Sequence, residues 1–117
     1  VWGIDTYGSV FKKYKETGIF DKEEIYPYVT EGIGEDFLPQ NVDFSVVDHF
    51  EKVDDRAAEI YTREIVRQEG IWAGNSAGSA IAGLLQRLTL TIGWAWLTLL
   101  AFHLSKAPSG VPRTERA

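Results

Sequence analysis

Two serine hydroxyls in a run of small residues are the chain's best candidates for contacting a ligand. Ser76 and Ser79 follow the apolar run Ile71–Ala73, which stops at Gly74, and a run rich in Ala and Leu comes after them. A strand, a tight turn and a helix N-terminus would offer a ligand free backbone N–H groups and the positive end of a helix dipole. The simpler interpretation, which the residues alone favour, is that Ser76 caps the helix.

A second candidate is a pair of glycines in the first half of the chain. Gly32 and Gly34 stand one residue apart, after the extended segment that ends at Thr30. Glycines placed in this way mark a positive φ or a backbone pressed against another group. A plain surface turn would give the same spacing.

The elements that would position these residues alternate between strands and helices. Strands alternating with helices predict an α/β fold with a parallel sheet flanked by helices, in which ligands bind at the carboxyl ends of the strands. We expect the segment 74–78 to lie at such an end. The sequence predicts the end of a strand at 1–4 that breaks at Asp5, a turn at 6–9, and a short helix or loop at 10–14 that Thr17-Gly18 ends. It then predicts a strand at 44–47, a helix at 54–69 with the acids Asp54-Asp55 in its first turn and Gly70 just past its end, a strand at 71–73 and a helix at 77–86.

Composition limits the classes of function. The chain has 117 residues, 44% of them hydrophobic, which suits at most one small folded domain. It has no cysteine, which excludes disulfides and thiolate chemistry and suits a cytoplasmic location, and its two histidines carry no metal-ligand spacing, so we expect no metal site. Residues 1–87 hold 9 basic and 16 acidic side chains, a net −7, which argues against nucleic acid as a partner. The chain opens in an apolar run without Met, and we interpret it as a piece of a longer protein.

Five short tags occur in the order of one known family. Together they resemble the later half of the catalytic domain in the cystathionine β-synthase and cysteine synthase family, pyridoxal-phosphate enzymes of fold type II. The resemblance covers roughly residues 1–86 and implies a homodimeric parent protein. The tags are Asp5-x-x-Gly8-Ser9, Thr17-Gly18, Glu31-Gly32-Ile33-Gly34-Glu35-Asp36-Phe37-Leu38-Pro39, Glu69-Gly70-Ile71 and Gly74-Asn75-Ser76-Ala77-Gly78-Ser79.

The resemblance implies a role for each matched position. Ser76 corresponds to the serine whose hydroxyl bonds the pyridine nitrogen of pyridoxal 5'-phosphate, a partner that leaves the ring a mild electron sink. Gly32 and Gly34 match the loop beside the cofactor and its bound substrate. Gly8 and Ser9 match a turn at a strand end in the substrate pocket.

The loop residues indicate one branch of the family. Glu31, together with Asp36, is more similar to the cystathionine β-synthases than to the cysteine synthases. The implied reaction is β-replacement on serine with homocysteine as the thiol, a lyase step of transsulfuration and cysteine biosynthesis. The alternative is cysteine synthesis from an activated serine and sulfide. Glu35 departs from the Tyr of the animal and yeast enzymes, so the thiol preference stays open.

The family's catalytic lysine is absent from this chain. The family binds its cofactor through a Schiff-base lysine and a phosphate loop, both upstream of the region resembled here. We expect all six lysines of this chain to lie on solvated surfaces, and the chain alone to be inactive. The six are Lys12, Lys13, Lys15, Lys22, Lys52 and Lys106.

The resemblance stops near Gln86, where an apolar segment begins. Residues 88–104 are seventeen positions without a formal charge, at the short edge of a membrane span, with Arg87 and Lys106 on either side. Residues 108–117 are expected to be disordered. We favour the interpretation that 87–117 is a frame-shifted or misassembled tail unrelated to the family. The alternative is a real membrane helix, which would make the chain an inactive, membrane-associated fragment that keeps the family's scaffold.

Overall fold

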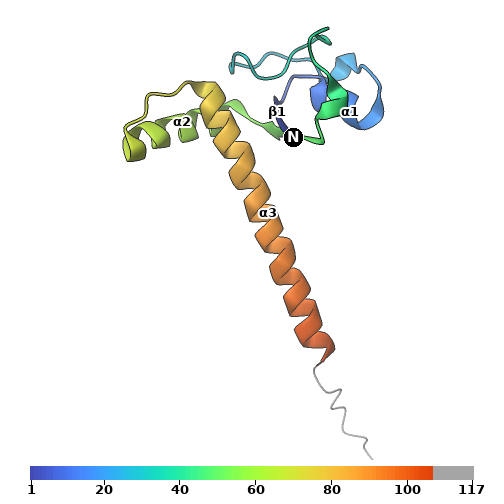
Figure 1. The fold of residues 1–117 in the computed structure, drawn as a ribbon, viewed down its shortest axis with the longest axis vertical. Helices are drawn as coiled ribbons and strands as arrows, with labels where there is room; N and C mark the ends of the chain where they lie inside the picture. The colour runs from blue at the N-terminus through green and yellow to red at the C-terminus, as the bar shows by residue number, and fades with distance from the viewer. Residues whose placement is uncertain (107–117) are drawn as a thin grey trace, which may run out of the picture. The chain divides into compact units, whose positions relative to one another are not determined.

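The computed structural model describes residues 1–106 and divides the chain into two units between Gln86 and Arg87 (Figure 1). The expected disorder of 108–117 lies outside the described residues. The first unit holds a small sheet, short helices and the start of a long helix, and the second begins within that helix. The elements are β1 (Trp2–Thr6), α1 (Phe11–Thr17), η1 (Lys22–Glu24), η2 (Phe44–Val46), β2 (His49–Val53), α2 (Asp55–Glu69) and α3 (Asn75–Ser105).

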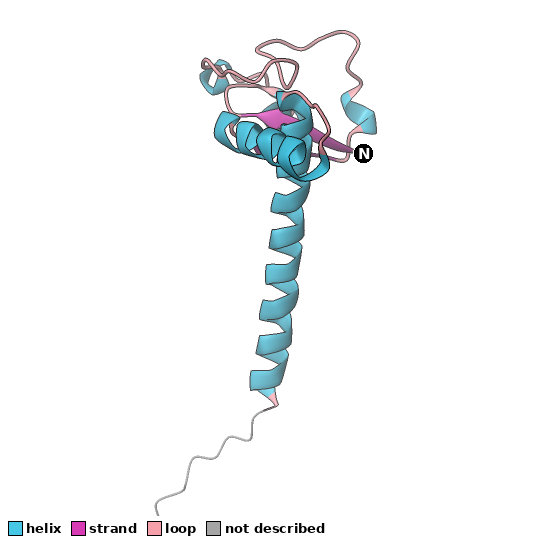
Figure 2. Ribbon diagram, turned by 90° about the vertical axis from the view of Figure 1, so that its left-hand side faces the viewer, coloured by secondary structure: helices cyan, strands magenta, loops and turns pink. Residues whose placement is uncertain are grey.

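The sheet of the first unit has two parallel strands, drawn in magenta in Figure 2. Trp2 pairs with His49 at one end of the register, and Thr6 pairs with Val53 at the other. Both strands therefore finish at the same edge. This confirms a small α/β arrangement. The first strand runs two residues further than predicted because Asp5, expected to break it, pairs in register with Lys52.

The strand predicted at 44–47 is wrong. Those residues form the 3₁₀ helix η2, and the strand comes later, at His49–Val53. The cause is a local cap: the Asp43 carboxylate accepts hydrogen bonds from the Ser45 N–H at 2.9 Å and the Ser45 hydroxyl at 2.6 Å. Such local bonds give the backbone an alternative to a sheet ladder. The 3₁₀ turn places the Phe44 ring against the Phe11 ring, with ring centroids 5.4 Å apart.

Both helices predicted around the sheet form in the first unit. The segment expected to be a short helix or a loop is α1, which ends as predicted at Gly18, where φ is +70°. The predicted helix at 54–69 is confirmed as α2, because Asp54 caps it through the Ala57 N–H and Gly70 ends it with φ of +65°. Val10, Phe11 and Phe50 make the small core between α1 and the sheet.

The strand predicted at 71–73 is also wrong. These residues form no regular element and pair with no strand in the described part of the chain, and the Trp72 side chain is 92% exposed. A strand forms only beside a neighbour that takes up its backbone hydrogen bonds. The helix predicted after it is confirmed as the beginning of α3. There, a Cβ at Gly78 would overlap the Ala58 carbonyl oxygen, so α3 packs closely on α2.

Candidate functional site at the carboxyl edge of the sheet

The two strand ends bring two short segments to one edge of the sheet. After β1, the chain turns at Gly8, whose φ is +99°, and the Ser9 N–H bonds back to the Thr6 carbonyl at 3.2 Å. After β2 come Asp54 and Asp55 at the start of α2. The carboxyl edge of a parallel sheet is where α/β proteins place their ligands. The site predicted from Gly8 and Ser9 is therefore at such an edge.

The loop after residue 30 is fastened to this turn. The Ser9 hydroxyl accepts a hydrogen bond from the Glu35 N–H at 3.0 Å, and the Val10 N–H donates to the Glu35 carbonyl at 3.1 Å. Gly34 makes this contact possible, because a Cβ there would lie 2.5 Å from the Ser9 hydroxyl oxygen. Its φ of +70° also favours glycine. The expectation that Gly34 is pressed against another group is confirmed.

A buried carboxylate lies beneath the contact between Gly34 and Ser9. Asp5 is fully buried, and one of its oxygens accepts the Lys12 N–H at 3.0 Å at the start of α1. The other oxygen has no hydrogen-bond partner among the described residues, and a Cβ at Gly34 would come within 2.6 Å of it. A buried polar atom without a partner is costly, and this packing leaves one carboxyl oxygen of Asp5 unsatisfied directly under the site.

A second carboxylate anchors the loop that covers the edge. Asp55 accepts hydrogen bonds from the Val29 N–H and the Thr30 N–H, both at 2.8 Å, and from the Thr30 hydroxyl at 2.6 Å. Burial alone would raise the pKa of this carboxyl, but the bonds from Thr30 and Val29 outweigh burial and hold the pKa below its ordinary value. Asp55 therefore stays charged near neutral pH and keeps the loop in place.

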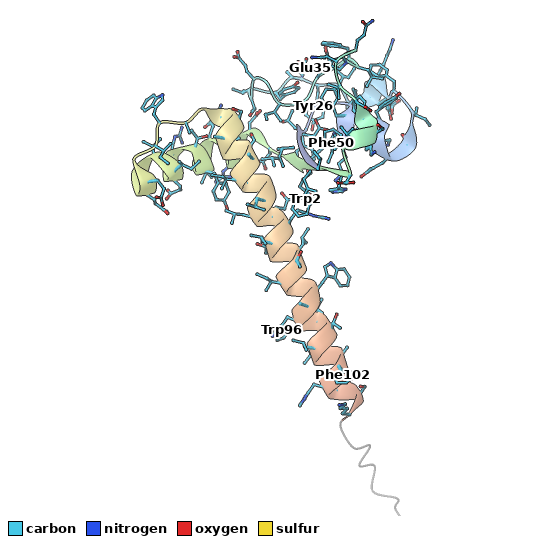
Figure 3. All side chains as sticks on the ribbon, viewed as in Figure 1. Trp2, Tyr26, Glu35, Phe50, Trp96 and Phe102 are labelled. Atoms are coloured by element: carbon cyan, nitrogen blue, oxygen red, sulfur yellow. The ribbon has the colours of Figure 1, made fainter. Side chains whose placement is uncertain are left out.

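An open cleft of about 460 Å³ lies between the turn and these loops. Burial raises the pKa of the Tyr28 phenol, and the negative charges of Glu35, Asp36, Asp5 and Asp55 raise it further. Tyr28 thus remains a hydrogen-bond donor at neutral pH inside an acidic surround. Tyr26 and Glu35, labelled in Figure 3, both line the cleft. The lining residues are Gly8, Ile25, Tyr26, Pro27, Tyr28, Glu35 and Asp36.

The expectation that all six lysines lie on solvated surfaces is wrong for Lys52. Its side chain is 10% exposed, and its ammonium donates to the Ser9 carbonyl at 3.0 Å and to Glu24 at 2.7 Å. The reason is its place near the end of β2, one position before Val53, from which it reaches the turn after β1. Lys52 braces the Gly8–Ser9 turn as an ion-paired cation.

The structure does not bring every predicted site residue to this edge. Gly32 has the expected positive φ, +74°, but nothing lies within 4 Å of where its Cβ would be. Ser76 is the second residue of α3 rather than the residue before the helix, so the capping interpretation is wrong in position. Its side chain is exposed, and its hydroxyl makes no hydrogen bond to another described residue.

Sequence reasoning missed the residues that hold the cleft together. Tyr28 carried no pattern that distinguished it from the other tyrosines. Asp55 appeared only as an acid in the first turn of a helix, and Asp5 only as a strand breaker. Lys52 had one available signal, its place two residues before the acidic pair that opens α2, close to the end of a strand.

Known proteins similar to this chain are named cystathionine β-synthases and cysteine synthases. A cystathionine β-synthase from Oryctolagus cuniculus is 40% identical over 80 residues, which are 68% of this chain and 14% of that protein. One from Dictyostelium discoideum is 35% identical over 102 residues, or 86% of this chain and 20% of that protein. A cysteine synthase from Haemophilus influenzae is 43% identical over 56 residues, or 48% of this chain and 18% of that protein. No family model matches the chain.

An α/β unit with a cleft at the carboxyl edge of its sheet is thus similar in sequence to these synthases. The chain belongs to the cystathionine β-synthase and cysteine synthase family. It spans 14–20% of the length of these relatives. Residues 1–86 make up less than three quarters of the 117 residues of the chain. The Dictyostelium match covers 86% of the chain, so it also includes part of the apolar segment that follows Gln86.

Proposed function

We propose that this chain is part of a cystathionine β-synthase of fold type II, a pyridoxal-phosphate lyase that condenses L-serine with homocysteine by β-replacement. The observation that carries the proposal is its similarity to proteins of that name from rabbit, yeast and Dictyostelium over 68–86% of the chain. Two cysteine synthases match 47–48% of it. Glu31 and Asp36 favour the same branch.

The chain's own residues would serve the substrate side of the reaction. The turn at Gly8 and Ser9 and the loop at Gly34 are joined by hydrogen bonds and close packing, so the cleft wall is preorganised. Its acidic lining, with Glu35 and Asp36, suits the ammonium group of an amino acid. Tyr28 keeps its proton and can donate a hydrogen bond to a bound carboxylate. We assign serine binding to this cleft.

The residues present fit only one end of pyridoxal phosphate. The exposed Ser76 hydroxyl is available to an acceptor such as a ring nitrogen. Among residues 1–106 no lysine bonds to Ser76, and Lys52 is committed to Glu24 and the Ser9 carbonyl. We propose that the chain alone does not hold the cofactor covalently and that the attaching lysine lies in the rest of a longer protein. When bound, the cofactor supplies the electron sink for replacement at the β-carbon.

The proposal is tested with a full-length protein that carries this chain. It is incubated with pyridoxal phosphate and either serine with homocysteine or O-acetylserine with sulfide, and the products are identified by mass spectrometry. We expect cystathionine from the first pair at a higher rate. Cysteine from the second pair alone would establish the alternative, a cysteine synthase. If neither pair gives a product, the alternative of an inactive fragment would be supported instead. We further propose that the full-length protein is a homodimer whose catalytic part lies in the cytoplasm.

A further inference from the structure

As far as the structure describes it, the second unit consists of the apolar later part of helix α3. α3 runs without a break from Asn75 to Ser105, and within residues 1–106 it alone is long and apolar enough to cross a membrane. Its most apolar stretch is not buried at all. A core helix of a soluble protein would be covered by other elements, so this helix lacks the cover that its composition requires.

The apolar side chains cover every side of the helix. The Trp94 side chain is 69% exposed and that of Trp96 is 62% exposed, and Figure 3 shows Trp96 projecting from α3. A helix that lies in a membrane surface has one charged face, and a helix with a single partner shows a narrow apolar seam. Neither pattern occurs here. The exposed apolar residues are Leu88, Leu90, Ile92, Trp94, Trp96, Leu97, Leu99, Leu100, Phe102 and Leu104.

The few polar side chains of this stretch are satisfied inside the helix. The Thr91 hydroxyl donates to the Arg87 carbonyl at 2.9 Å, and the Thr98 hydroxyl donates to the Trp94 carbonyl at 2.8 Å. In a bilayer every polar group needs an internal partner, and these bonds meet that condition. The other two polar side chains, Thr89 and His103, stand in the first and last turns of the stretch.

The length and the flanking charges also fit a bilayer. From Arg87 to Ser105 the helix rises about 27 Å, close to the hydrocarbon thickness of roughly 30 Å. Lys106 follows directly, and its ammonium lies 4.2 Å from the centre of the Phe102 ring in a cation–π contact at the end of the helix. We propose that residues 88–104 insert into a lipid bilayer as a single span, with Arg87 and Lys106 at its two surfaces. An origin by frame shift would not alter this property, because it depends only on the residues present.

The test uses the complete chain and phosphatidylcholine vesicles. In a variant with Trp2→Phe and Trp72→Phe, the fluorescence comes from Trp94 and Trp96, at the middle of the proposed span. We expect a blue shift on adding vesicles, and stronger quenching by lipids brominated deep in the acyl chain than by lipids brominated near the headgroup. Leu97→Arg should lower the vesicle partition coefficient about a hundredfold. The matched control Ile60→Arg, on the 44% exposed Ile60 of α2, should leave it unchanged.

Three results would overturn the proposal. Stronger quenching near the headgroup would mean that the helix lies in the interface. Equal effects of Leu97→Arg and Ile60→Arg would mean that the span is not what binds. The third result is a soluble oligomer that does not bind vesicles and that dissociates in the Leu97→Arg variant. It would show that a second copy of the chain covers the helix. In cells, the same proposal expects the protein to stay in the membrane pellet after alkaline carbonate extraction.

Discussion

The contact between Gly34 and Ser9 can be tested by a pair of substitutions that differ in one physical respect. Gly32 and Gly34 both have positive φ, +74° and +70°, so an alanine at either position costs about 1–2 kcal/mol of backbone strain. Only at Gly34 does the new methyl group meet other atoms, the Ser9 hydroxyl at 2.5 Å and an Asp5 oxygen at 2.6 Å. Overpacking of that kind adds about 1–3 kcal/mol.

The assay is amide hydrogen exchange at the two bonds that fasten the loop. The Glu35 N–H donates to Ser9, and the Val10 N–H donates to the Glu35 carbonyl. Gly34→Ala should lower the protection of both amides about 5- to 150-fold more than Gly32→Ala does, since each 1.4 kcal/mol is a factor of ten. The Ala57 amide at the α2 cap serves as the internal control. Equal losses in the two variants would refute the argument that Gly34 is needed for close approach.

The anchoring of the loop by Asp55 leads to further predictions. Asp55→Asn leaves one carbonyl oxygen where three hydrogen bonds ended, so the free energy of unfolding in urea should fall by about 1.5–3 kcal/mol. Asp54→Asn removes the same charge but keeps a good helix cap, and should change it by less than about 0.5 kcal/mol; similar losses in both would contradict the anchoring role. Because the pKa of Asp55 is lowered by folding, its contribution to the free energy of unfolding is complete above the ordinary pKa of 3.8 and is lost as the pH falls through the lower pKa of the folded state. In an acid titration of stability, Asp55→Asn should abolish this contribution to the pH dependence. In a full-length protein, Ser76→Asp should slow β-replacement and change the cofactor spectrum, because a carboxylate holds the ring nitrogen protonated, whereas normal rate and spectrum would remove the proposed contact.

The elements with strong local signals could be predicted from the sequence. Asp54 and Gly70 bound α2 at both ends, and the α3 helix follows from its apolar run. The strand at 71–73 failed because a strand needs a neighbour, which no local pattern supplies. The segment at 44–47 failed because the side-chain bonds of Asp43 turned an apolar run into a 3₁₀ helix.

The candidate site was predictable only in part. Gly8, Ser9 and Gly34 were singled out, and the structure brings them together at one edge. Their partners come from distant parts of the chain, such as Lys52, 43 positions from Ser9, so only the folded chain reveals them. Whether Ser76 and Gly32 join the same site in a longer protein stays a prediction, as does the division of the chain into a family part and an unrelated tail.

We propose that this chain is one part of a pyridoxal-phosphate enzyme whose Schiff-base lysine lies elsewhere in a longer protein. This central claim is tested most directly by loading residues 1–117 and a full-length protein with pyridoxal phosphate, reducing each with borohydride and locating the phosphopyridoxyl group by peptide mass spectrometry. We predict one modified lysine in the full-length protein, upstream of Val1, and none at a defined site in the isolated chain. Stoichiometric labelling of Lys52 or another lysine of this chain, or no labelling of the full-length protein, would contradict the claim.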